Sequence, residues 1–213
     1  MTIYALSTGS GISGIAIIRI SGIKSSHAIK ALTNTALPKP KTAVIKKFSK
    51  INTSDLIDEG LLLWFPGPAS YTGEDMAEIH IHGSIAVVKS ILNELSKIQD
   101  CRLAEPGEFT KIAFQNGKLN LMKAESISDL ISAETEIQRQ QAIKIMSGRS
   151  SEKFNSLREK LLKILSNVEA KIDFPEEDLP DDVIKDIKND SKKIRKEIEI
   201  ILNDQKVGER IRE

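Results

Sequence analysis

Three polar side chains, Glu78, His80 and His82, alternate with apolar ones in residues 77–82. A period of two is typical of a β-strand, so we expect the three polar groups on one sheet face and Ala77 with its apolar neighbours on the other. A carboxylate there could accept two parallel N–H bonds from a heterocycle. The His-x-His spacing also fits a metal ion, although only one other histidine exists and no H-E-x-x-H motif is present. Solvated polar residues on an open sheet are the third interpretation.

Two cations could complete a binding site. Arg19 interrupts the apolar run of residues 15–20. If it is buried, it needs a carboxylate or an anionic ligand, and Glu78 is a candidate; otherwise it lies at an exposed strand end. Lys118 follows Gly117, which we expect to end a short helix, with Pro106 as the first helical residue. Taken alone, it fits a surface lysine favoured by the helix dipole.

Glycine-rich motifs give little support to nucleotide binding by these residues. Residues 9–14 (GSGISG) match G-x-G-x-x-G, but the β-branched run IAII follows where a dinucleotide fold needs a helix. We therefore expect a loop between two strands. No G-x-x-x-x-G-K-[ST] occurs in the sequence, so these residues carry no P-loop.

The composition indicates a globular protein. The 213 residues are 40% apolar and 29% charged, with a net charge of +1, which gives no support to a strongly electrostatic nucleic-acid binder. A single cysteine, Cys101, excludes a disulfide framework and a Cys-based zinc site, and it is compatible with a reducing cytoplasm. We expect no targeting segment and no membrane span, because the longest apolar run is short and contains Arg19.

The two halves of the chain differ. The first predicts strands at residues 2–7, 15–21, 60–65 and 77–82, and helices at 26–32 and 84–95, the last with Ile85 on its apolar face. The strand at 15–21 is apolar on both faces, which predicts a central, covered strand. The second half is helical. We therefore expect an α+β domain with a mixed sheet over residues 1–119, followed by an α-helical domain, a partial bundle, over residues 120–213.

Apolar residues in the second half recur at spacings of three and four, which predicts helix packing. One stripe runs from Leu157 to Ile172 in a helix that Pro175 ends, and another from Ile184 to Ile201. The acidic, proline-containing stretch at 173–182 predicts a loop between them. Basic residues at 192–196 alternate with acidic ones and fit a solvated helix face.

Seven ordered strings resemble the family of tRNA modification GTPases called MnmE or TrmE, over essentially the whole chain. They are residues 14–22 (GIAIIRISG), 63–68 (LWFPGP), 71–75 (YTGED), 82–83 (HG), 106–110 (PGEFT), 124–131 (AESISDLI) and 172–177 (IDFPEE). The resemblance implies an N-terminal domain that binds a tetrahydrofolate one-carbon derivative and forms a homodimer, then a helical domain.

The resemblance also implies residue roles. Arg19, Glu78 and Lys118 match the folate-site positions of the family, with 5-formyl- or 5,10-methylene-tetrahydrofolate as the cofactor. In the family a G domain, which binds GTP with potassium and magnesium, would follow these residues. The implied partners are the FAD-dependent protein MnmG and tRNA, in the cytoplasm and without a membrane. Together they add an aminomethyl-type group to carbon 5 of the wobble uridine.

Two other functions stay open at this point. One is a ligand-free module that serves dimerisation or interaction alone. The other is a stand-alone, folate-dependent aminomethyl transferase, because such enzymes have a related folate-binding domain. Folate binding separates the family function from the first alternative, and dependence on tRNA and an FAD protein separates it from the second.

Overall fold

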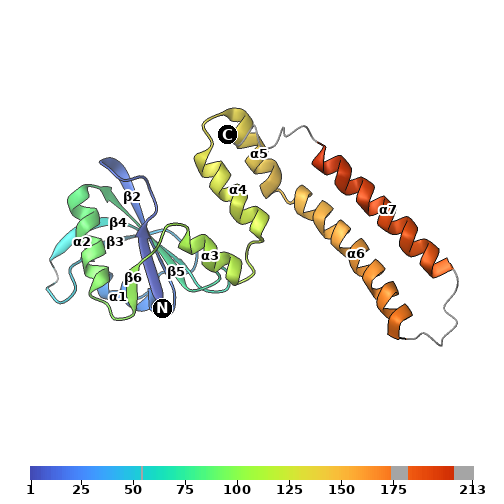
Figure 1. The fold of residues 1–213 in the computed structure, drawn as a ribbon. Helices are drawn as coiled ribbons and strands as arrows, with labels where there is room; N and C mark the ends of the chain where they lie inside the picture. Colours follow the sequence, from blue (N-terminus) through green and yellow to red (C-terminus); the bar gives the residue numbers. More distant parts are fainter. Residues whose placement is uncertain (54, 174–181, 204–213) are drawn as a thin grey trace. The chain divides into compact units, whose positions relative to one another are not determined.

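The structure is a computed structural model that describes residues 1–53, 55–173 and 182–203. Internal contacts divide the chain into two units, residues 1–120 and 121–213. The first unit contains all six strands of the described residues and three helices (Figure 1). They are β1 (Thr2–Leu6), β2 (Ser13–Ser21), α1 (Ser25–Thr33), β3 (Val44–Ser49), β4 (Leu56–Phe65), β5 (Met76–Gly83), α2 (Ile85–Ser96), β6 (Cys101–Leu103) and α3 (Glu108–Gln115).

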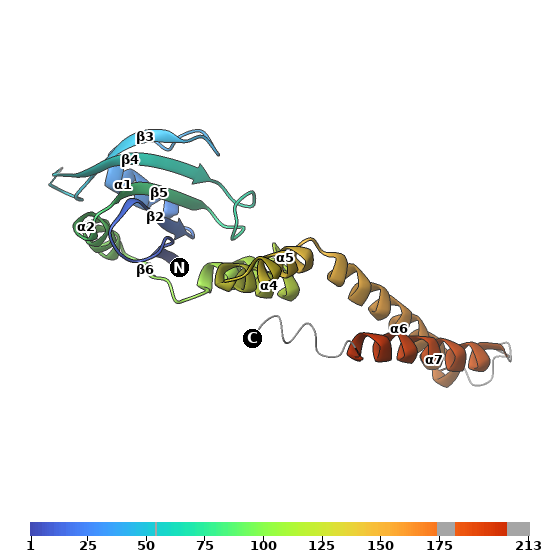
Figure 2. The ribbon, with the colours of Figure 1, turned by 90° about the horizontal axis from the view of Figure 1, so that it is seen from above.

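The strands form one mixed sheet in the order β3-β4-β5-β2-β1-β6. Only the pairing of β6 with β1 is parallel, and all other neighbours are antiparallel. Figure 2 shows β3, β4 and β5 side by side. The fold is therefore α+β, as the sequence predicts. Residues 9–12 of the G-x-G-x-x-G segment lie in the exposed loop between β1 and β2, its last two residues begin β2, and no helix follows it, so the segment connects two strands as predicted.

One face of the sheet carries the core of this unit. Ile18 and Ile20 of β2 and Ile79 of β5 are fully buried there, and they pack with apolar residues of α1 and α2. We call the opposite side the open face. It carries the alternate residues of the same strands, such as Arg19 and Glu78, because successive side chains point to opposite sides.

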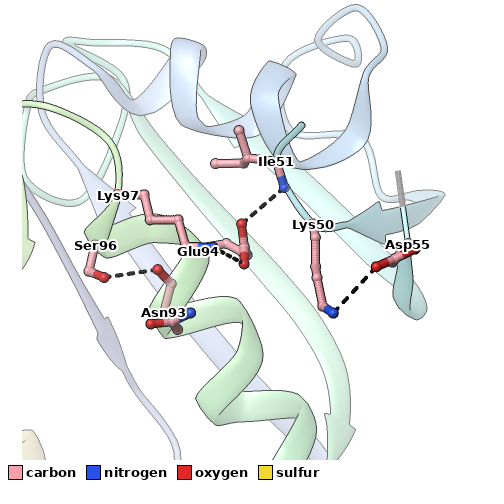
Figure 3. A network of polar contacts seen from close by, with 7 residues as sticks. All are labelled: Lys50, Ile51, Asp55, Asn93, Glu94, Ser96 and Lys97. Atoms are coloured by element: carbon pink, nitrogen blue, oxygen red, sulfur yellow. Dashed lines mark hydrogen bonds and ion pairs between the residues drawn. The ribbon is translucent and has the colours of Figure 1, made fainter. Parts of the chain in front are cut away.

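A buried carboxylate fastens α2 to the turn between β3 and β4 (Figure 3). Glu94 is 2% exposed and accepts hydrogen bonds from Lys97 Nζ at 2.6 Å and from the backbone N–H of Ile51 at 3.0 Å. The hydrogen bond from Lys97, opposed by burial, lowers the pKa of this carboxyl, and the Ile51 bond adds to the effect. Both oxygens are thus used within the fold, so Glu94 has a structural role.

Two expectations are wrong in detail. Strand β2 is central, but its open face is only partly covered, and Ile15 is 62% exposed. Helix α3 begins at Glu108 after Gly107, so Pro106 precedes the helix. Ile85 is the first residue of α2 and is half-exposed there. The sequence analysis also missed β3 and β6, the two edge strands.

The second unit is helical: α4 (Leu121–Ser132), α5 (Glu136–Met146), α6 (Arg149–Asp173) and α7 (Asp182–Leu202). A capping box between Thr135 and Gln138 starts α5. Helices α6 and α7 pack together, with Leu157 and Ile194 buried and Lys160 bonded to Glu197 at 2.7 Å. Much of both apolar stripes is exposed.

The expected loop at 173–182 and its Pro175 lie almost wholly outside the described residues. In the described part of the chain, no helix is long and apolar enough to cross a membrane.

Candidate functional site

Arg19 and Glu78 form an ion pair at the centre of the open face. They are direct cross-strand partners on β2 and β5. Arg19 donates from Nε and from Nη2 to the same oxygen, Glu78 Oε1, at 3.0 and 2.8 Å. The side chains are 26% and 18% exposed, so the pair is partly desolvated but can be reached by a ligand. The structure thus gives Arg19 the carboxylate partner that the sequence analysis considered.

Two aromatic rings flank the guanidinium. The Arg19 Cζ atom lies 5.3 Å from the ring centre of Tyr71 and 5.5 Å from that of Phe109, which are cation–π distances. Tyr71 is in the loop after β4, and its hydroxyl is hydrogen bonded to Thr110 on α3 at 2.9 Å. These contacts restrict the position of Arg19. The sequence analysis gave no role to Tyr71 or Phe109, although both belong to strings that it quoted.

The loop between β4 and β5, residues 66–75, covers one end of the open face. Ser21, at the end of β2, is hydrogen bonded to Thr72 at 2.7 Å, and the backbone N–H of Gly22 donates to Asp75 O at 2.9 Å. Ser21 and Thr72 are fully buried. Arg19 and Glu78 form the next cross-strand pair on the open face after Ser21 and Met76, so they lie at the edge of the part that the loop covers.

Lys118 lies beside the same loop. Its Nζ donates to the carbonyl of Pro68 at 2.9 Å. The αL conformation of Gly117 ends α3 and turns the chain, so that the Lys118 N–H donates to Ala113 O. A Cβ at Gly73 would lie 3.4 Å from Lys118 Cγ, which shows how closely the loop approaches. The structure therefore brings Arg19 and Glu78 into direct contact, and it connects Lys118 to them through the loop that also holds Tyr71.

His80 and His82 follow Glu78 along the open face, with different surroundings. His80 Nε2 is buried, has no hydrogen-bond partner among the residues that the structure describes, and lies 3.7 Å from Glu78 Oε2. His82 is exposed, and its Nδ1 is hydrogen bonded to Asp58 Oδ1 at 2.8 Å. Burial acts to raise the pKa of Asp58, but hydrogen bonds from His82 and from the Glu59 N–H lower it overall. The sequence analysis did not identify Asp58.

Metal binding gains no support from this arrangement. Among the described residues, no three His, Cys, Asp or Glu side chains converge as ligands. The two histidines instead face different partners.

A shallow groove of about 180 Å³ lies along β4 and β5 beyond the ion pair. It is lined by residues that include His80, His82, Leu61 and Ile15. His80 therefore belongs both to the surroundings of Glu78 and to the groove.

Comparisons with known proteins give a consistent family assignment. A family model described as "GTP-binding protein TrmE N-terminus" matches residues 2–118, and one described as "MnmE helical domain" matches residues 121–213. The chain is 70% identical over 213 residues to a tRNA modification GTPase MnmE of Pelagibacter ubique, covering 48% of that protein. It is 48% identical over 208 residues, or 98% of its length, to an MnmE of Rickettsia akari, covering 47% of that relative.

A more distant similarity is to a zebrafish protein named mitochondrial 5-taurinomethyluridine-[tRNA] synthase subunit GTPB3. The identity is 45% over 212 residues, which is 99% of this chain and 42% of the relative. The chain thus spans about half the length of the curated relatives that it matches.

Proposed function

The chain belongs to the MnmE, or TrmE, family of tRNA modification GTPases, and from this premise we propose that its first unit binds a tetrahydrofolate one-carbon derivative. The bound cofactor is 5-formyl- or 5,10-methylene-tetrahydrofolate, and it supplies the one-carbon unit for modification of the wobble uridine of tRNA. Arg19, Glu78 and Lys118 form the site.

The observation that carries this proposal is that Arg19 occupies only one of the two carboxylate oxygens of Glu78. Both hydrogen bonds that it accepts from the described residues end on Oε1, which leaves Oε2 available. A pterin ring presents an amino group and a ring N–H side by side, and Oε2 can accept a hydrogen bond from this edge of the ring. Arg19 holds the carboxylate through Oε1, and Oε2 is left for the ligand.

Lys118 and Arg19 provide the positive charge that the dicarboxylate tail of a folate requires. Lys118 Nζ now donates to a backbone carbonyl, Pro68 O, and an ammonium has two further donors. It can therefore bind a carboxylate without breaking that contact. Which of the two cations meets the tail is open in this proposal.

The family function also requires partners. We propose a homodimer, the FAD-dependent protein MnmG and tRNA, acting together in the cytoplasm. GTP hydrolysis with potassium and magnesium belongs to a G domain outside these 213 residues. Exposed apolar side chains on the open face, among them Ile15, Ile45 and Leu61, supply surface for the second copy.

The experiment is a titration of the 213-residue chain with 5-formyltetrahydrofolate, followed by calorimetry and thermal melting. At one hundred times the dissociation constant, the ligand should stabilise the chain by about 2.7 kcal/mol. The control ligand is p-aminobenzoylglutamate, which carries the tail without the pterin and should bind much more weakly. A folded chain whose melting temperature does not respond to the complete cofactor would favour a ligand-free interaction module.

A second experiment separates the family function from a stand-alone aminomethyl transferase. The cofactor-loaded protein is incubated with tRNA, with and without the FAD protein. One-carbon transfer that needs neither tRNA nor the FAD protein would favour the transferase.

A further inference from the structure

The Nε2 atom of His80 is buried and has no hydrogen-bond partner among the described residues. A buried polar atom without a partner is rare and costly, so it needs an explanation. The cross-strand neighbours of His80 are Ile17 on β2 and Leu61 on β4, and neither side chain can form a hydrogen bond.

A polar atom close to this nitrogen belongs to the proposed site. Glu78 Oε2 lies 3.7 Å from His80 Nε2, which is too long for a hydrogen bond. It is the same oxygen that Arg19 leaves unused. The nearby negative charge favours the tautomer with the proton on Nε2. A hydrogen-bond donor and an acceptor, both unused, therefore lie side by side at the edge of the loop that covers the sheet.

A ligand that satisfies both must present a donor and an acceptor on neighbouring atoms. We propose that His80 is a further binding residue of the site and donates from Nε2 to the C4 carbonyl of the pterin, beside the ring N–H that Glu78 accepts. The inference rests on the proposed folate site and adds His80 as the residue that recognises the substituent at position 4 of the ring. Because Nε2 is covered in the free protein, a rotation of the imidazole has to bring its N–H to the ligand.

This role makes His80 a specificity residue. A folate has an oxygen at C4, which accepts the bond. A 4-amino analogue has a donor there, which meets a second donor and leaves the histidine N–H unpaired. Removing the imidazole should weaken the 4-oxo ligand but not the 4-amino ligand, which loses an unfavourable donor–donor contact, an asymmetry that a merely structural histidine would not produce.

The test compares two probes, 5-formyltetrahydrofolate and its 4-amino-4-deoxy analogue, by calorimetry. His80→Phe should weaken the first about 3- to 10-fold, the worth of one hydrogen bond, and should not weaken the second. His80→Gln retains an amide donor and should restore most of the affinity for the first. His82→Phe, the same change two residues along the strand, is the matched control and should affect neither probe.

A second measurement needs no substitution. In the wild-type chain with ¹⁵N-labelled histidine, the Nε2–H signal of His80 should shift and exchange more slowly with 5-formyltetrahydrofolate, but not with the 4-amino analogue. Equal effects of His80→Phe on both probes, or an unchanged His80 signal in the saturated protein, would overturn the inference and leave the folate site standing. A wild-type chain that binds neither probe overturns the proposed function itself.

Discussion

Arg19 and Glu78 face each other across β2 and β5, and two N–H groups of the arginine converge on one carboxylate oxygen. A bidentate pair would use both oxygens and close the site. The one-sided geometry fixes the carboxylate and leaves Oε2 beside His80. The ion pair therefore joins β2 to β5 and also leaves Glu78 Oε2 in place as a hydrogen-bond acceptor for a ligand.

Replacing this acceptor should affect binding more than removing the peripheral lysine. Glu78→Gln replaces one acceptor oxygen with a donor that faces the donors of the pterin, so 5-formyltetrahydrofolate should bind about 10- to 100-fold more weakly. Lys118→Ala should cost less, because its contact is exposed. Calorimetry measures both, with Glu105→Gln in the exposed turn before α3 as the control. A larger loss for Lys118→Ala would contradict the assigned orientation of the ligand.

Glu94→Gln should destabilise the first unit by about 2 kcal/mol at pH 7, because a buried, charged acceptor is lost. Since folding lowers the pKa of Glu94, its contribution is fully present above the unfolded pKa near 4.5 and is lost as the pH falls through the folded value. The difference between wild type and variant should therefore shrink below pH 4.5.

Denaturant unfolding at several pH values measures this difference. Glu59→Gln, half-exposed on β4, is the control and should change stability little at any pH. A Glu94→Gln deficit that persists unchanged at pH 3 would show that packing, and not charge, explains the loss.

Gly60→Ala should be poorly tolerated. A Cβ at this position of β4 would lie 2.0 Å from the carbonyl oxygen of His80, so the strands would have to move apart. We expect a loss of about 1–3 kcal/mol and weaker cofactor binding, because His80 and Glu78 lie on the displaced strand. Gly9→Ala, where nothing lies within 4 Å, is the matched control for thermal melting. Equal melting temperatures for the two variants would contradict this account of Gly60.

The proposed homodimer can be tested on the open face. Ile45 is 69% exposed on β3, in the cross-strand row that includes Leu61 and His80. Ile45→Asp should shift the chain from dimer to monomer in sedimentation equilibrium, because burying a charge at an apolar interface is costly. Ile23→Asp, which is 82% exposed in the turn after β2, should leave the dimer intact. Dissociation by the second variant alone would place the interface elsewhere.

Amide exchange should show that α7 is less protected than β2. Ile194 is buried against α6, but Ile184 and Ile198 are 48% and 38% exposed, so few apolar contacts hold the helix. Exchange of Ile184–Ile201 should be faster than exchange of the buried Ile18 and Ile20. Equal protection in a monomeric sample would mean that this helix pair needs no further packing.

Local sequence patterns were sufficient for much of the fold. The alternation in residues 77–82 predicted which side of β5 is buried, and the β-branched run after the glycine-rich segment excluded a dinucleotide fold. Both features depend on side chains that are neighbours along the chain. The edge strands β3 and β6 were missed because one contains two lysines and the other has three residues, so only pairing with distant strands defines them.

The sequence by itself determined the family and nominated Arg19, Glu78 and Lys118, because Arg19 lies in one of the family strings and the other two lie near such strings along the chain. Only the tertiary structure decided how these residues meet. The antiparallel register of β2 and β5 sets Arg19 opposite Glu78, and the loop at 66–75 with α3 brings Tyr71 and Phe109 to the guanidinium. Only the tertiary structure shows that Nε2 of His80 is buried without a hydrogen-bond partner in the described part of the chain. Whether a buried atom has a partner depends on every chain segment that folds around it, and no local pattern records that.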